Sequence, residues 1–227
     1  MKKIITTVLL CLFSLVMFAQ AYVRYYNKGL RLARKGQNER AWYFFTKAIK
    51  ENQWLTQAWY NRALVCSRLK NYKEAIADYT KAIDLKPHFP QAYNNRAADL
   101  EVLNETTAAW NDYTAAIAQD SGYALPFFNR GVLYFHRSDY ESALNDFSYA
   151  ITADPAMTNA WYNRGITKYK LRDYAGAVSD LSIVVKQRPE DNNACKYLSI
   201  ASLKINKDEE VTNIAPIHHS HEMTSRR

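Results

Sequence analysis

Residues 59–63 read Trp59-Tyr60-Asn61-Arg62-Ala63, and this pattern recurs along the chain every 34 residues. An aromatic residue opens each copy, and asparagine, a basic residue and a small residue close it. The other copies are Tyr25-Tyr26-Asn27-Lys28-Gly29, Tyr93-Asn94-Asn95-Arg96-Ala97, Phe127-Phe128-Asn129-Arg130-Gly131 and Trp161-Tyr162-Asn163-Arg164-Gly165. Five copies in one register, without insertion or deletion, indicate five structural repeats. We number them one to five, at 22–55, 56–89, 90–123, 124–157 and 158–191.

Each repeat carries the periodicity of two helices. In the first helix, the aromatic residue at repeat position 4 is followed four residues later by glycine or alanine on the same face, so a neighbouring helix can approach closely. In the second helix, position 20 is always alanine and position 24 is always large and apolar, which gives an amphipathic stripe. Pro87, Pro155 and Pro189 at position 32 end the second helix. The pattern therefore predicts five helix-turn-helix hairpins.

On these residues the chain resembles the tetratricopeptide repeat (TPR) family. The resemblance covers residues 22–191 and implies an all-α fold, a right-handed TPR superhelix (α-solenoid) of five 34-residue helix-turn-helix repeats. Residues 192–205 keep the register but carry more polar side chains, which predicts a C-terminal capping helix. Residues 206–227 are polar and without pattern, and we expect them to be disordered.

The first 21 residues have the features of a signal peptide. Lys2 and Lys3 precede the apolar run from Ile4 to Phe18, and Ala19-Gln20-Ala21 supplies a small-x-small cleavage site. The run is shorter than the roughly 20 residues of a membrane-spanning helix. We expect cleavage after residue 21 and export to the periplasm or the exterior, with no membrane span left. An uncleaved anchor is the alternative.

Composition and residue inventory argue against several functions. The formal net charge is +8, yet no run of five or six like charges occurs, so we expect a basic excess spread over a soluble surface, with no nucleic-acid partner. None of the five histidines lies beside a plausible nucleophile, and no glycine-rich phosphate loop is present. The sequence predicts no enzymatic activity and no cofactor. The tail motif His218-His219-Ser220-His221 could bind a divalent metal, but a solvated tail is the simpler interpretation, and no metal site is predicted.

Two charged series change together along the repeats. Position 7 is arginine in repeats two to five and Lys28 in repeat one, while position 23 is aspartate in repeats two to five and Phe44 in repeat one. An acid therefore occurs only where an arginine does, which predicts structural ion pairs between the two helices of a repeat. The predicted pairs are Arg62 with Asp78, Arg96 with Asp112, Arg130 with Asp146, and Arg164 with Asp180.

A third series has ligand-binding chemistry. Position 6 is asparagine in every repeat, and a carboxamide can both donate and accept a hydrogen bond. The family resemblance implies that this face lines a concave groove that holds an extended peptide. The alternative is that the asparagines only join adjacent helices. The candidate groove residues are Asn27, Asn61, Asn95, Asn129 and Asn163, with Tyr26, Tyr60, Phe128 and Tyr162 at position 5 and Phe135 and Tyr169 at position 12.

Taken together, these features predict a non-enzymatic scaffold that binds a protein or peptide partner on the groove face. A cell-envelope assembly component that associates through the solenoid ends is one alternative. A glycan-binding adaptor is another, because aromatic faces stack on sugars. Residues alone leave the partner and the oligomeric state open.

Overall fold

The structure is a computed structural model that describes the backbone of residues 21–214 and the side chains of residues 21–206. The predicted signal peptide lies almost entirely outside these residues, as does the tail from residue 215 onward. Within the described part, all regular structure is helical and no strand occurs. None of the helices described is long and apolar enough to cross a membrane.

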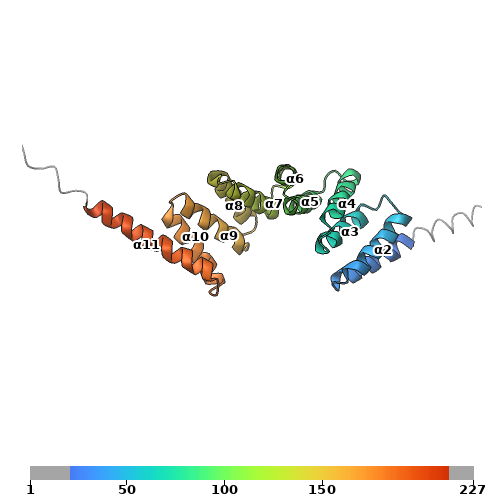
Figure 1. The fold of residues 1–227 in the computed structure, drawn as a ribbon, viewed down its shortest axis with the longest axis horizontal. Coiled ribbons are helices and arrows are strands. Elements are labelled where there is room, and N and C mark those ends of the chain that lie inside the picture. Colours follow the sequence, from blue (N-terminus) through green and yellow to red (C-terminus); the bar gives the residue numbers. More distant parts are fainter. Residues whose placement is uncertain (1–20, 215–227) are drawn as a thin grey trace, which may run out of the picture. The chain divides into compact units, whose positions relative to one another are not determined.

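Eleven helices follow one another along residues 21–214, each joined to the next by a short turn (Figure 1). Repeat one contains a first helix at residues 21–34 and α2. The remaining bounds are α2 Asn38–Glu51, α3 Thr56–Arg68, α4 Tyr72–Leu85, α5 Pro90–Val102, α6 Thr106–Gln119, α7 Ala124–His136, α8 Tyr140–Ala153, α9 Thr158–Lys170, α10 Tyr174–Gln187 and α11 Asn192–Ile214. In repeats two to five the first helix begins at position 1 and the second at position 17. The predicted all-α class and its helix-turn-helix organisation are confirmed.

The helices form two compact units that divide between Pro126 and Phe127, near the start of α7. In the first unit, α3 packs on α4 and α5 packs on α6, and neighbouring hairpins meet through α2 with α3 and α4 with α5. In the second unit, α9 packs on α8 and α10, and α11 covers α10. Within each unit, these helices therefore contact mainly their neighbours in the chain, as expected of repeat proteins.

The core of each hairpin pairs a small residue with a large one. The side chains at position 24 are almost fully buried in all five repeats: Phe45, Tyr79, Tyr113, Phe147 and Leu181. Position 8 faces them and is glycine where the partner is Phe45, Phe147 or Leu181. A Cβ on Gly29 would lie 2.6 Å from the Phe45 ring, and one on Gly131 would lie 2.8 Å from Phe147. Glycine is therefore required at these two positions, because the phenylalanine ring occupies the space that a Cβ would need.

The turn inside each hairpin has a backbone feature that the sequence did not predict. Position 15 has a positive φ in all five repeats, with values between 60° and 71°: Gly36, Lys70, Asn104, Ser138 and Arg172. In repeat two the turn is closed by backbone bonds from Lys70 N to Ser67 O and from Asn71 N to Cys66 O, both 2.9 Å long. Four of the five positions hold this left-handed conformation without glycine, at a cost of about 1 kcal/mol each.

The last helix is longer than the sequence predicted. We expected a capping helix that ends at residue 205, whereas α11 runs from Asn192 to Ile214. Residues 207–210 read Lys-Asp-Glu-Glu, of which lysine and glutamate favour helices, and neither glycine nor proline interrupts the chain before Pro216. A residue that precedes proline disfavours helical geometry, which accounts for an end at residue 214.

Candidate functional site

The four predicted Arg–Asp pairs lie within bonding distance in the structure. Each arginine Nε is 2.7 or 2.8 Å from an aspartate Oδ2 in the second helix of the same repeat. Nη2 donates to Oδ1 at 2.7 or 2.8 Å, so every pair is bidentate. The aspartate side chains are at most 10% exposed. Burial raises the pKa of the Asp78 carboxyl, and the bonds from Arg62 oppose that rise.

The arginines also reach the preceding repeat, a contact that the sequence reasoning missed. Arg62 Nη1 donates to Thr46 Oγ1 at 3.1 Å, and Arg96 Nη1 donates to Thr80 Oγ1 at 2.9 Å. In the second unit, Arg164 Nη1 donates to Ser148 Oγ at 3.3 Å. Each of these arginines therefore joins three helices. A signal was present in the sequence, because position 25 is always serine or threonine: Thr46, Thr80, Thr114, Ser148 and Ser182.

Repeat one holds its helices together in a different way. Lys28 Nζ lies 4.3 Å from the centre of the Phe44 ring, in place of an ion pair. The Phe44 ring also contacts Tyr25, with 6.3 Å between ring centres. A cation over an aromatic face is attracted by the ring quadrupole. Positions 7 and 23 therefore form a cation–π contact in repeat one and an ion pair in repeats two to five.

The asparagines of repeats two and three connect successive first helices. Asn61 Nδ2 donates to the Tyr26 hydroxyl at 3.0 Å and to the Gln57 carbonyl at 2.7 Å. Asn95 Nδ2 donates to the Tyr60 hydroxyl at 3.0 Å, and its Oδ1 accepts from Asn94 at 3.1 Å. At these two positions the structure shows the alternative use of the series, in which asparagine joins adjacent helices. The amide oxygen of Asn61 accepts no bond within the described part of the chain and can therefore accept one from a ligand.

The other candidate groove residues differ among themselves. Asn27 is exposed, and Asn163 is half-buried. Asn129 already interacts with other groups of the protein. In the register of the Tyr–Asn bonds, Asn163 corresponds to Phe128, which has no hydroxyl to accept a bond. The series therefore does not form a uniform ladder.

The aromatic candidates pack largely against their own repeats. Tyr60 lies against Phe89 with 4.7 Å between ring centres, and burial raises its pKa. In the second unit Phe128 contacts Phe147, Phe135 contacts Tyr140, and Tyr169 contacts Tyr174 and Tyr197, at centre distances of 5.4 to 5.9 Å. Tyr162 is half-buried as well, and burial raises its pKa. These rings support the fold and present only part of their surface to solvent.

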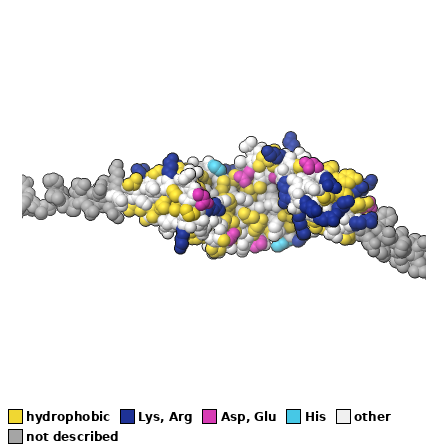
Figure 2. Space-filling model, turned by 90° about the horizontal axis from the view of Figure 1, so that it is seen from below, with side chains coloured by type: hydrophobic (Ala, Val, Ile, Leu, Met, Phe, Trp, Pro, Cys, Tyr) yellow, Lys and Arg dark blue, Asp and Glu magenta, His cyan; other side chains and the backbone are white. Residues whose placement is uncertain are grey.

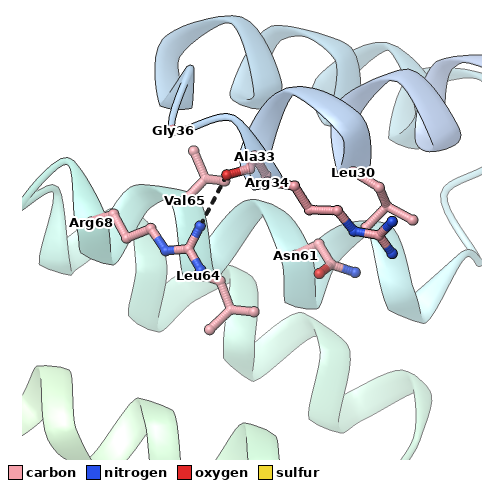
Figure 3. Close-up of a pocket in the computed structure, with 8 residues that line it drawn as sticks. All are labelled: Leu30, Ala33, Arg34, Gly36, Asn61, Leu64, Val65 and Arg68. Carbon is pink, nitrogen blue, oxygen red and sulfur yellow. Dashed lines mark hydrogen bonds between the residues drawn. The ribbon is translucent and has the colours of Figure 1, made fainter.

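One pocket brings a predicted groove residue together with open apolar surface. It lies between the first helix of repeat one and α3 and has a volume of about 490 Å³ (Figure 3). It is lined by Leu30, Ala33, Arg34, Gly36, Asn61, Leu64, Val65 and Arg68. We call it the α3 pocket. The amide oxygen of its Asn61 accepts no bond within the described part of the chain.

The basic excess is concentrated in the two repeats that form this pocket, contrary to our expectation of an even spread. Repeats one and two contain fourteen lysines and arginines against five acids, whereas repeats three and four contain three against nine. Figure 2 shows dark blue side chains gathered over the end of the first unit that adjoins the grey N-terminal residues. The net charge of the whole chain conceals this separation, because the positive charge of repeats one and two and the negative charge of repeats three and four partly cancel.

Comparison with known proteins supports the repeat family and fold. Residues 56–89 match the family model of the tetratricopeptide repeat. The structure resembles YrrB, a TPR protein with an unusual peptide-binding site, at 22% identity and a TM-score of 0.64, over 79% of this chain and 96% of that one. It also resembles pilF of Pseudomonas aeruginosa at 17% identity and a TM-score of 0.74, over 86% of this chain and 89% of that one. MamA of Desulfovibrio magneticus RS-1 gives 19% identity and a TM-score of 0.67, over 76% and 98%. No curated protein matches the sequence.

Proposed function

We propose that this tetratricopeptide-repeat fold serves as a non-enzymatic scaffold that binds an extended segment of a partner protein along its first helices. The α3 pocket carries the proposal. Leu30 and Leu64 give it an apolar wall, and Asn61 offers an acceptor for a backbone N–H. The likeness to YrrB supports the same reading, since that protein has a peptide-binding site.

The test uses an array of overlapping synthetic peptides probed with the fluorescently labelled chain. Leu64→Glu places a charge in the apolar wall, and we expect it to lose most of the peptides that wild type retains. Leu203→Glu is the matched control, because Leu203 is 68% exposed on α11 and lies outside the pocket. Equal retention of the same peptides by all three proteins would contradict the proposal.

Export is a second part of the proposal, supported by Lys2, Lys3 and the apolar run that follows them. The mature protein begins at Tyr22 and resides in the periplasm or outside the cell. N-terminal sequencing of the protein recovered from cell-envelope and medium fractions tests this. A chain that still begins at Met1 in the cytoplasmic fraction would refute it.

Self-association is a second candidate function, favoured by the opposite net charges of repeats one and two and of repeats three and four. Complementary charged regions on one chain can attract a second copy. Mass measurement over a range of concentrations at low and high salt separates the two functions. A monomer under all conditions would eliminate self-association and leave the peptide-binding proposal intact.

A further inference from the structure

Two arginines of the α3 pocket differ from the arginines that form the four ion pairs with aspartate. Arg34 and Arg68 occupy position 13 of repeats one and two, and both are exposed. Neither forms an ion pair with a carboxylate in the described part of the chain, whereas Arg62 donates to both carboxylate oxygens of Asp78. Among the residues that the structure describes, the one polar contact of Arg68 is a 3.5 Å approach of its Nη1 to the Ala33 carbonyl, which is long for a hydrogen bond. Both guanidinium groups are therefore available to a ligand.

The local charge at the pocket is positive. Its lining contains no aspartate or glutamate among the described residues. The first helix of repeat one and α3 both end near it, and each helix C-terminus contributes a partial charge of about −0.5. Two formal positive charges exceed these partial charges, and the surrounding repeats are themselves strongly basic. An anionic group is attracted both from a distance and at contact.

The rest of the pocket restricts what kind of anion fits. Leu30 and Leu64 supply apolar surface beside the arginines, and Asn61 supplies an amide oxygen that accepts no bond within the described part of the chain. Figure 3 shows Arg34 and Arg68 coming from the two facing helices, with Asn61 between them in this view. A small inorganic anion would contact the arginines but neither the leucines nor the amide oxygen of Asn61. A peptide with an acidic and an apolar side chain can contact the arginines, the leucines and the amide oxygen together.

We propose that the α3 pocket binds an acidic-apolar pair, such as adjacent leucine and glutamate, within an extended segment of a partner protein. The positive charges of Arg34 and Arg68 hold the ligand carboxylate, the leucine packs on Leu30 and Leu64, and a backbone N–H donates to Asn61 Oδ1. The inference rests on the proposed function and names the class of sequence that the scaffold selects.

The experiment uses a synthetic peptide array in which identical flanking sequences surround a central Leu-Glu, Leu-Gln or Leu-Lys pair, all with amidated C-termini. We expect wild type to favour the Leu-Glu peptides. Fluorescence anisotropy on the best of these should show that Arg34→Ala and Arg68→Ala each weaken binding about two- to fivefold, as is typical of exposed ion pairs. The double reversal Arg34→Glu/Arg68→Glu should move the preference to Leu-Lys.

Arg40→Ala is the control, because Arg40 is exposed in the same repeat, bonds to Gln37 and does not line the pocket. It should bind like wild type. If Arg40→Ala loses as much peptide affinity as Arg34→Ala, binding depends on the overall positive charge of the repeat, and the assignment of the ligand to the α3 pocket is wrong. Equal binding of Leu-Glu and Leu-Gln peptides that still depends on Leu64 would overturn this inference and leave the proposed function standing. No binding by any peptide would refute both proposals.

Discussion

Repeats one and two have the same two-helix backbone but join their helices by different contacts. In repeat two, Arg62 bonds to Asp78 in its own hairpin and to Thr46 in the hairpin before it. In repeat one, Lys28 lies over Phe44 and makes no comparable connection to another repeat within residues 21–206, whose side chains the structure describes. The comparison shows that the arginine does two tasks: it closes a hairpin and joins it to its predecessor. Closing the hairpin alone does not require an ion pair.

We expect the largest effect from replacing the cation at position 7 of each repeat, Arg62 in repeat two and Lys28 in repeat one. Arg62→Leu leaves the Asp78 carboxylate buried without its partner, and we expect a loss of about 3 kcal/mol in the free energy of unfolding. Lys28→Leu removes the half-buried cation–π contact with Phe44 and should cost about 1 kcal/mol. Urea unfolding followed by circular dichroism measures both. The double variant Arg62→Leu/Asp78→Leu should recover part of the loss. An Arg62→Leu protein as stable as Lys28→Leu would show that the ion pair adds nothing.

A smaller effect distinguishes the cores of the two repeats. Gly29→Ala would bring a Cβ to 2.6 Å from the Phe45 ring, and overpacking of this kind costs about 2 kcal/mol. The reverse change in repeat two, Ala63→Gly, should cost only about 1 kcal/mol, the difference in helix propensity. Thermal unfolding of the two variants beside wild type provides the measurement. A more stable Gly29→Ala protein would mean that Phe45 moves aside without cost.

The smallest effect concerns the turns at position 15. Lys70 has φ 63° and Gly36 has φ 71°. Lys70→Gly relieves the strain of a left-handed side-chain-bearing residue and should stabilise the protein by about 0.5 kcal/mol, whereas Gly36→Ala should destabilise it by about 1 kcal/mol. Urea midpoints of the two variants give the values. A shift of the same sign for both would contradict the equivalence of the two turns.

The sequence predicted the register of the fold with little error, because a period of 34 residues fixes where each helix begins. It missed the left-handed turn at position 15, since Lys70, Ser138 and Arg172 are not residues that normally indicate such a backbone. It missed the bonds from arginine to the preceding repeat, because they depend on how hairpins stack. It left the use of Asn61 and Asn95 open, as the same amide can serve a ligand or a neighbouring tyrosine. The charge separation was visible in the sequence and was lost by counting over the whole chain.

The bond from arginine to the preceding hydroxyl also gives successive repeats a common connection. Arg62, Arg96 and Arg164 each find a serine or threonine at the same place in the repeat before them. A further copy inserted between repeats two and three would therefore meet a matching donor on one side and a matching acceptor on the other. Repeat one has the acceptor Thr46 but lacks the arginine, so it can only begin a series. An array built in this way can change its length by whole repeats, and only its first member is fixed in place.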